Sequence, residues 1–267
     1  MTNRLDPIIN QKKREIALLQ AFLQAHPEHA IVQLLRGTMQ REGRKSFKQA
    51  LQGPNLSVIA EIKRKSPSKG ELAQISDPVA LAQTYIDGGA DALSILTDEL
   101  FFNGKLADLT SVSLACADSV TPILRKDFVL DVSQIAEAVV AGADAILAIV
   151  GVLGQETRTI LNAAKAMGID VLVEVHTEAE LNLALESGAE IIGVNNRDLT
   201  TFQVDSGRAF DLISLIPKGI ISIAESGIRE ARLARDYHKV GFDAVLIGEA
   251  LVTSVVPEQF IGACRDV

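Results

Sequence analysis

The sequence is poor in cysteine and in positive charge. Its two cysteines, Cys116 and Cys264, have the spacing of neither metal ligands nor a redox pair, so a disulfide framework and a zinc site have no support. A formal net charge of −8 argues against the basic face that nucleic-acid binding requires. We therefore expect no metal and no nucleic-acid partner, and any anionic ligand must be held by a local basic cluster.

Long hydrophobic runs are also missing. The longest nearly uncharged apolar stretch, residues 145–154, has about ten residues, whereas a membrane-spanning helix needs about 20. Charged residues at positions 12–15 interrupt the region in which a secretory signal would place its apolar core. These patterns predict a cytoplasmic protein that has no membrane partner.

Eight short, β-branched apolar runs follow one another from residue 58 onward, and helical periodicity fills most of the intervals. The predicted strands are 58–63, 92–96, 122–126, 145–150, 171–175, 191–195, 221–225 and 244–247, and the clearest helices are 77–87, 132–141, 178–186 and 229–238. Alternating strands and helices indicate parallel strands joined by crossovers, and continuous apolar runs indicate a sheet covered on both faces. With 267 residues and no gap for a second core, the α/β pattern favours a closed (β/α)8 TIM barrel over an open doubly wound sheet.

The first 50 residues precede the first predicted strand and also look helical. Asp6 and Pro7 resemble an N-cap and first-turn pair. A single apolar helix face is predicted from Ile16, Leu19, Phe22 and Leu23. We expect residues 1–267 to form one barrel domain, with residues 1–50 as an N-terminal helical extension packed on it.

Four predicted helix-to-strand turns share a pattern of glycine, a small or apolar residue and an acidic residue. They are Gly89-Ala90-Asp91, Gly142-Ala143-Asp144, Gly188-Ala189-Glu190 and Gly241-Phe242-Asp243. Glycine is favoured where a helix ends in a left-handed residue. Because these turns precede strands, they belong to the N-terminal end of the barrel, where we expect stability rather than catalysis.

Polar residues end several of the predicted strands, and barrel enzymes build their active sites at those C-terminal ends. Period two places Glu61 and Lys63 on the same, interior side of the first strand, where an inward structural ion pair is the alternative interpretation. Lysine and glutamate gathered at one barrel mouth suit proton transfer beside an anionic substrate. The further residues at these strand ends are Lys126, Glu174, Asn195 and Arg197.

Glycines follow the last two predicted strands, in Glu225-Ser226-Gly227-Ile228 and in Ile247-Gly248-Glu249-Ala250. We expect each glycine to stand at the start of a helix, where backbone N–H groups bind anions, and these two loops are the usual phosphate site of such barrels. A phosphorylated small molecule is therefore indicated, the alternative being glycines that only turn the chain. His176 has no serine nucleophile or metal spacing nearby, so we expect it to support a neighbouring catalytic group.

The stretch Glu61-Ile62-Lys63-Arg64-Lys65-Ser66-Pro67-Ser68-Lys69-Gly70 resembles the signature of indole-3-glycerol-phosphate synthases. Further stretches are similar to motifs of that family, in the family's order, and the resemblance covers about residues 50–255. They are Leu96-Thr97-Asp98 with Phe101-Phe102-Asn103-Gly104, Leu124-Arg125-Lys126-Asp127-Phe128, Val173-Glu174-Val175-His176, Gly193-Val194-Asn195-Asn196-Arg197-Asp198-Leu199 and Glu225-Ser226-Gly227-Ile228.

The resemblance implies a carboxy-lyase of tryptophan biosynthesis that needs no cofactor. Its substrate would be 1-(2-carboxyphenylamino)-1-deoxyribulose 5-phosphate, which closes to indole-3-glycerol phosphate with loss of carbon dioxide and water. This phosphorylated small molecule is the expected partner, and we expect a monomer or a weak homo-oligomer.

The resemblance also implies roles for single residues. Lys126 would protonate the ketone oxygen, Lys63 would contact the substrate and share the proton chemistry, and Glu174 would act as acid and base in dehydration. Glu61 and Asn195 would complete the catalytic set by orienting the substrate and the charged side chains. The implied substrate-binding residues are Ser66, Pro67, Phe102, Phe128, Leu147, Arg197, Glu225, Ser226, Gly227 and Gly248.

Two positions depart from the family's pattern. Ala148 stands where a second leucine is common, and Glu249 stands where a small hydroxyl residue is frequent. A carboxylate at position 249 repels phosphate, so only backbone N–H groups are expected to bind phosphate there.

Other phosphate-binding barrels are the nearest alternatives, in particular a phosphoribosyl isomerase from the same pathway or a thiazole-type synthase that uses a lysine Schiff base. A non-catalytic barrel subunit is an alternative of another class. The combination of Lys63, Lys126 and Glu174 argues against the isomerase. Together with Glu61 and Asn195, these residues also argue against loss of activity.

Overall fold

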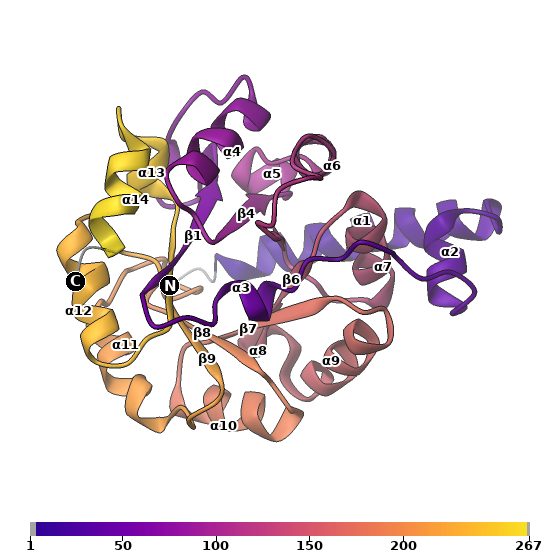
Figure 1. Ribbon diagram of the computed structural model, residues 1–267. Helices are drawn as coiled ribbons and strands as arrows, with labels where there is room; N and C mark the ends of the chain where they lie inside the picture. Colours follow the sequence, from indigo (N-terminus) through magenta and orange to yellow (C-terminus); the bar gives the residue numbers. More distant parts are fainter. Residues whose placement is uncertain (1–3, 266–267) are drawn as a thin grey trace.

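A computed structural model describes residues 4–265 of the chain. Eight parallel strands close into a barrel in the order β1-β10-β9-β8-β7-β6-β5-β4, which confirms the predicted fold class (Figure 1). Four predicted strands have the observed bounds, and the other four differ by one residue. The barrel strands are β1 (Ser57–Ile62), β4 (Ala92–Leu96), β5 (Ile123–Lys126), β6 (Ala145–Ile149), β7 (Asp170–Val175), β8 (Ile191–Asn195), β9 (Ile221–Glu225) and β10 (Ala244–Ile247), and β2 (Lys65–Ser66) pairs with β3 (Gly70–Glu71) in the loop after β1.

Helices surround the barrel, so both faces of its strands are buried. Of the four clearest predicted helices, residues 132–141 match, two differ by one residue, and the last begins two residues later than predicted. No described helix combines the length and the apolar character that a bilayer crossing requires. The helices are α1 (Leu5–Ala25), α2 (Ala30–Leu35), α3 (Phe47–Ala50), α4 (Pro78–Asp87), α5 (Glu99–Phe102), α6 (Leu106–Ala115), α7 (Val132–Ala141), α8 (Val150–Leu153), η1 (Gly154–Glu156), α9 (Thr157–Ala166), α10 (Glu178–Ser187), α11 (Gly207–Leu212), η2 (Ile213–Leu215), α12 (Ala231–Lys239), α13 (Glu249–Val252) and α14 (Pro257–Arg265).

The N-terminal segment contacts both ends of the barrel. Phe47 of α3 is fully buried against the inward-facing side chains of the strands, and Ile8 of α1 is fully buried in the same apolar cluster. Lys48 of α3 pairs with Glu190 just before β8, so α3 lies at the N-terminal end. In Figure 1, α3 lies in front of the barrel centre and the more distant α1 lies behind it.

The predicted apolar face of α1 is partly wrong. Leu23 is buried and Leu19 packs against the core, but Phe22 is 43% exposed and stacks on His26. Successive helical residues turn by about 100°, so Phe22 points away from the face that carries Leu23. The buried face instead runs back through Lys12 to Ile8.

The predicted N-cap of α1 is also wrong. The helix begins at Leu5 after Arg4, so Asp6 and Pro7 both lie inside the first turn. A proline is tolerated there because the first N–H groups of a helix have no intrahelical acceptor.

The glycine turns at the N-terminal end of the barrel have the predicted conformation. In three of the four turns the acidic side chain binds the start of the preceding barrel strand. Asp144 accepts hydrogen bonds from the backbone N–H of Ile123 at 3.0 Å, at the start of β5, and from that of Lys45 at 3.1 Å. Asp91 and Asp243 bind the starts of β1 and β9 in the same way. The left-handed glycines, with φ of 89°, 99°, 91° and 112°, are Gly89, Gly142, Gly188 and Gly241.

Replacing Asp144 by alanine should destabilise the protein without changing its chemistry. The substitution leaves the buried N–H of Ile123 and the partly buried N–H of Lys45 without their acceptor and removes an ion pair with Arg41. The loss costs about 2–4 kcal/mol, while the C-terminal end of the barrel is untouched. Urea unfolding measures the loss, and Asp118→Ala, at an exposed position, is the control. A stability equal to that of the control would contradict this role for Asp144.

Candidate active site

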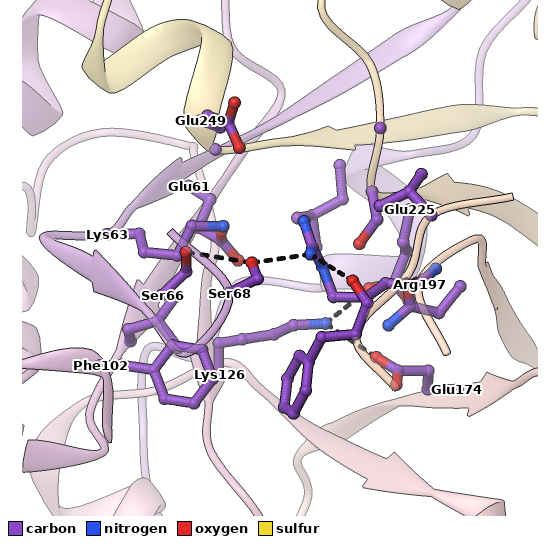
Figure 2. Close-up of a pocket in the computed structure, with 18 of the residues that line it drawn as sticks. Glu61, Lys63, Ser66, Ser68, Phe102, Lys126, Glu174, Arg197, Glu225 and Glu249 are labelled. Carbon is purple, nitrogen blue, oxygen red and sulfur yellow. Dashed lines mark hydrogen bonds and ion pairs between the residues drawn. The ribbon is translucent and has the colours of Figure 1, made fainter. Parts of the chain in front are cut away.

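One pocket at the C-terminal end of the barrel is lined by every site residue that the sequence predicts. Its free volume is about 1060 Å³, including the part open to solvent. Figure 2 shows the charged side chains converging on this space. The fifteen residues are Glu61, Lys63, Ser66, Pro67, Phe102, Lys126, Phe128, Leu147, Glu174, Asn195, Arg197, Glu225, Ser226, Gly227 and Gly248. The structure brings them together, and their individual roles stay predictions.

Lys126, at the end of β5, lies at the centre of the charged groups. Its Nζ is 2.5 Å from Glu225 Oε2 and 3.1 Å from Glu174 Oε2, and its side chain is only 13% exposed. Burial lowers the pKa of Lys126, but the carboxylates of Glu225, Glu174 and Glu61 outweigh it and leave that pKa above its ordinary value. Lys126 is therefore an ammonium at neutral pH and can donate a proton.

The two carboxylates beside Lys126 differ in their affinity for a proton. Burial raises the pKa of Glu174, but Lys126 and His176 lower it by more, so the pKa lies below its ordinary value. Burial raises the pKa of Glu225, Lys126 lowers it, and the charges of Glu174 and Glu61 help to leave it raised to about 7. One carboxylate thus stays ionised while the other exchanges a proton near neutral pH.

Two glycines leave space for the carboxylates of Glu225 and Glu61. A Cβ atom at Gly193 would overlap the carboxylate of Glu225, and one at Gly248 would overlap that of Glu61. Gly193, in the middle of β8, was not among the predicted site residues. Its signal in the sequence is a glycine inside a strand, which often marks a close approach by another group.

Glu61 and Lys63 form the inward ion pair that sequence reasoning gave as the alternative to a functional role. Both side chains also line the pocket. The ion pair and a place in the site are therefore compatible, and Glu61 in addition faces the buried group around Lys126.

Arg197 ties the loop after β8 to the loop after β1. Its Nη1 donates to Ser68 Oγ at 3.0 Å and to the carbonyl of Phe202 at 3.1 Å, and its backbone N–H donates to Asn195 Oδ1 at 2.9 Å. Ser68 lies in the first motif but was not predicted as a site residue. Its signal was its place two residues after Ser66, in a loop at the catalytic end.

One wall of the pocket is apolar. The rings of Phe102 and Phe128 lie 6.2 Å apart between centroids, and Leu147 and Pro67 line the same pocket. Further apolar lining residues resemble ordinary core residues in the sequence, so no pattern distinguished them. They are Leu96, Ile149, Leu199, Phe202, Val204, Ile228, Leu246 and Ile247.

The opposite corner offers backbone donors, although its geometry corrects one prediction. Gly227 is not at a helix start, because Ser226 and Gly227 form a left-handed turn, with φ of 68° and 82°, and α12 begins only at Ala231. Gly248 does precede α13 directly. Among residues 4–265, no group accepts a hydrogen bond from the backbone N–H of Gly227 or Gly248.

Glu249 faces this corner as a charged group. It forms an ion pair with Lys69 and lies 3.8 Å from Arg229 Nε. Burial raises the pKa of Glu249, but the hydrogen bond and charge of Lys69 lower it by more, so the pKa falls below its ordinary value. The carboxylate of Glu249 is thus paired with Lys69 and Arg229, the two cations that would otherwise be available to a bound anion.

His176 lies behind Glu174 rather than in the pocket lining. Its Nε2 is 3.5 Å from Glu174 Oε1 and its Nδ1 is 3.2 Å from Glu180 Oε2. Burial lowers the pKa of His176, but Glu180 and Glu174 raise it by more, so the net shift is upward. This placement supports the prediction that His176 acts through its neighbour.

Comparison with known proteins identifies the family. The family model described as indole-3-glycerol phosphate synthase matches residues 5–263. The chain belongs to the indole-3-glycerol phosphate synthase family. A curated indole-3-glycerol phosphate synthase from Opitutus terrae is 44% identical over 270 residues, which cover 99% of both chains. Another from Mycobacteroides abscessus is 49% identical over 218 residues, which cover 81% of this chain and 78% of the relative.

Solved structures outside the indole-3-glycerol phosphate synthase family share the fold. The 3-hexulose-6-phosphate synthase from Salmonella typhimurium superposes with a TM-score of 0.62, covering 79% of this chain and 97% of its own, at 16% identity. This likeness shows the barrel architecture alone.

The stability of a Glu225→Gln variant, measured relative to wild type, should be more favourable at pH 8 than at pH 5. A carboxyl group whose pKa is raised on folding, here to about 7, stabilises the fold while protonated and loses this contribution as pH rises through the folded pKa. Glutamine cannot ionise, so its advantage over glutamate grows between pH 5 and pH 8. Thermal unfolding at both pH values tests this, with exposed Glu230→Gln as control. An equal difference at both pH values would refute the raised pKa.

Proposed function

We propose that this pocket performs the reaction of its family, which converts 1-(2-carboxyphenylamino)-1-deoxyribulose 5-phosphate to indole-3-glycerol phosphate in tryptophan biosynthesis. The observation that carries the proposal is the ammonium of Lys126 between two carboxylates, with an apolar wall on one side and free backbone donors on the other. The substrate has the matching polarity, because its aromatic ring and its phosphate stand at opposite ends of a chain that contains the ketone.

Ring closure forms a carbon–carbon bond between the carboxylate-bearing ring carbon and the ketone carbon. The ketone oxygen gains negative charge as the bond forms and takes a proton from Lys126. A positioned ammonium stabilises this charge mainly in the transition state, which speeds the step rather than tightening binding. Glu225, with its raised pKa, is placed to return a proton to Lys126.

Two losses then complete the indole. The bond to the carboxylate breaks, carbon dioxide leaves, and the electron pair restores the aromatic ring. The new hydroxyl leaves as water while the neighbouring carbon gives up a proton. Glu174, ionised in the free protein, is the group we assign to this proton transfer, with Lys63 as a contact to the substrate and a second source of protons.

The remaining residues have positioning and binding roles in the proposal. Glu61 balances Lys63, and Asn195, whose side chain helps to lower the pKa of Glu174, is assigned to orient that carboxylate. The aromatic ring of the substrate is assigned to the wall with Phe102 and Phe128. The phosphate is assigned to the corner with free N–H groups. The residues assigned to bind substrate are Ser66, Pro67, Phe102, Phe128, Leu147, Arg197, Glu225, Ser226, Gly227 and Gly248.

The alternative activities fit the site less well. A Schiff-base lysine must lose its proton to attack a carbonyl, which burial favours only where neighbouring carboxylates are few. Lys126 has the opposite environment, because its pKa is raised. The combination of Lys63, Lys126 and Glu174 argues against a phosphoribosyl isomerase, and a non-catalytic subunit has no use for three buried carboxylates around an ammonium.

The proposal extends to the whole chain. We assign residues 1–267 to one domain, with residues 1–50 as its N-terminal extension, because this segment contacts both ends of the barrel; residues 1–3 and 266–267 lie outside the described part. A single urea-unfolding transition is the outcome that one domain requires. A cytoplasmic location is proposed because Cys116 and Cys264 are free thiols, and a monomer or weak homo-oligomer remains the expected assembly.

The activity is tested with the purified protein and the substrate. Indole-3-glycerol phosphate is fluorescent, so its appearance is followed directly over a range of pH. No product at any pH would overturn the proposed function.

Lys126→Ala should lower kcat by about 10² to 10⁴-fold, the usual cost of losing a general acid. It should also reduce stability, because the variant leaves Glu174 and Glu225 buried without their ammonium.

Lys63→Ala should raise KM as well as lower kcat, and Glu174→Gln should slow dehydration after carbon dioxide has left. Steady-state and single-turnover kinetics separate these effects. A near-normal kcat for folded Lys126→Ala would transfer the acid's role to Lys63.

Gly227→Val should raise the dissociation constants of phosphorylated ligands at least tenfold. The dissociation constants of unphosphorylated ring compounds should not change. Its Cβ would lie 2.7 Å from Val204 and force the turn out of the phosphate corner. Gly219→Val is the matched control, since Gly219 has a similar φ of 92° but open space around it. Glu249→Ser should act in the opposite direction, because it releases Lys69 and removes a charge that repels phosphate. Equal weakening of both ligand classes by Gly227→Val would place the phosphate elsewhere.

A further inference from the structure

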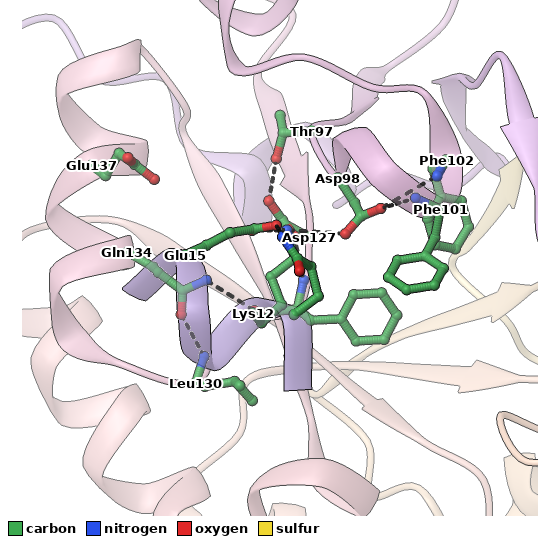
Figure 3. Close-up of polar contacts among 12 residues, drawn as sticks. Lys12, Glu15, Thr97, Asp98, Phe101, Phe102, Asp127, Leu130, Gln134 and Glu137 are labelled. Carbon is green, nitrogen blue, oxygen red and sulfur yellow. Dashed lines mark hydrogen bonds and ion pairs between the residues drawn. The ribbon is translucent and has the colours of Figure 1, made fainter. Parts of the chain in front are cut away.

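We infer that Lys12, on helix α1, is a positioning residue for the reaction, whose ammonium fixes the two loops that carry the ring-binding Phe102 and Phe128. The inference rests on the proposed function and goes beyond it, because Lys12 does not line the pocket. Figure 3 shows its side chain reaching from α1 to the carboxylates of both loops.

The Lys12 ammonium lies between carboxylates in a buried place. Its Nζ is 2.8 Å from Asp127 Oδ1, 3.0 Å from Asp98 Oδ2 and 2.7 Å from Glu15 Oε2. Lys12, Asp98 and Asp127 are 2%, 0% and 3% exposed, so solvent does not screen these contacts. Glu15 is on α1 itself, whereas the two aspartates follow β4 and β5 at the catalytic end of the barrel.

Asp98 sets the position of Phe102. One carboxylate oxygen accepts hydrogen bonds from the backbone N–H groups of Phe101 at 2.8 Å and Phe102 at 3.3 Å, as the N-cap of the short helix α5. The other oxygen receives no hydrogen bond among residues 4–265 and faces only the charge of Lys12. The N-cap that holds Phe102 therefore depends on Lys12 for its charge balance.

Asp127 stands between two site residues, Lys126 and Phe128. Its Oδ1 accepts a hydrogen bond from the backbone N–H of Phe128 at 2.8 Å and forms the ion pair with Lys12. Its Oδ2 accepts from Thr97 Oγ1 at 2.6 Å and from Arg125 at 3.2 Å. A shift of Asp127 moves both of its neighbours, and with them the acid and one side of the ring pocket.

An ion-pair contact between α1 and the two loops can do something that apolar packing cannot. Replacing a buried ion pair by apolar side chains often leaves stability unchanged or improves it, so packing alone does not require a lysine here. Ile8, one turn earlier on the same face, already provides apolar contact. A cation shared by two carboxylates instead fixes the separation of the two loops, and hence of the two rings that are 6.2 Å apart.

Lys12→Met tests the inference with a side chain of similar length and no charge. We expect kcat/KM to fall at least tenfold. The dissociation constant of a substrate analogue whose ketone is reduced to an alcohol should rise at least tenfold, while that of inorganic phosphate should stay within twofold. Lys13→Met, at the adjacent exposed position, is the matched control and should behave as wild type in all three measurements.

The selective loss of ring binding separates positioning from general damage. A folded Lys12→Met variant with unchanged kcat/KM would overturn the inference, as would equal weakening of the analogue and of phosphate. If wild-type protein makes no product, the proposed function fails instead.

If the Lys12→Met variant does not fold, the same binding measurements on an Asp98→Asn variant test the inference. Asparagine keeps the N-cap of α5 but removes the charge that Lys12 balances. Analogue binding should weaken at least threefold with phosphate binding unchanged, and binding within the error of wild type would overturn the inference. Where both variants fold, the double variant should lose no more than Lys12→Met alone, because both changes remove the same contact; additive losses would overturn it.

Discussion

The active site is built around one buried ammonium, that of Lys126, and the rest of the structure brings its carboxylate partners to it. Lys126 faces Glu61, Glu174 and Glu225, which come from β1, β7 and β9, while Lys126 itself ends β5. These positions span most of the chain, and only closure of the barrel makes them neighbours. The barrel is therefore the condition for the site, because an open sheet would leave the carboxylates on distant strands without their cation.

An imbalance of charge follows from this arrangement. Three carboxylates, those of Glu61, Glu174 and Glu225, face the single ammonium of Lys126, so negative charges outnumber positive ones immediately around it when all of these groups are ionised. Glu225 absorbs the excess through its raised pKa, whereas Glu174 stays ionised beside Lys126 and His176. Two chemically identical side chains thereby receive different proton affinities from their surroundings alone, which a reaction with an acid step and a base step requires.

Sequence reasoning predicted the strands well because each is a short apolar run, and it placed the site at the C-terminal strand ends because several of them carry polar residues. It did not find Lys12, since a charged residue in an apolar face reads as an interruption, although its spacing of four from Ile8 and from Ile16 put it on that face. The start of α12 and the left-handed turn at Ser226 were also missed. Their geometry depends on loops packed against one another, which no local pattern encodes.

The two ends of the pocket differ in how firmly their loops are joined. At the ring end, Lys12 and its aspartates are almost fully buried, so their attraction is little screened and breaking it leaves charges without solvent. At the phosphate end, the pair of Lys69 and Glu249 is 41% and 26% exposed, and exposed pairs contribute little and exchange partners easily. The ring wall is thus formed before substrate arrives. In the proposed function, we expect the phosphate corner to reorganise on binding, because an incoming dianion competes with Glu249 for the same cations.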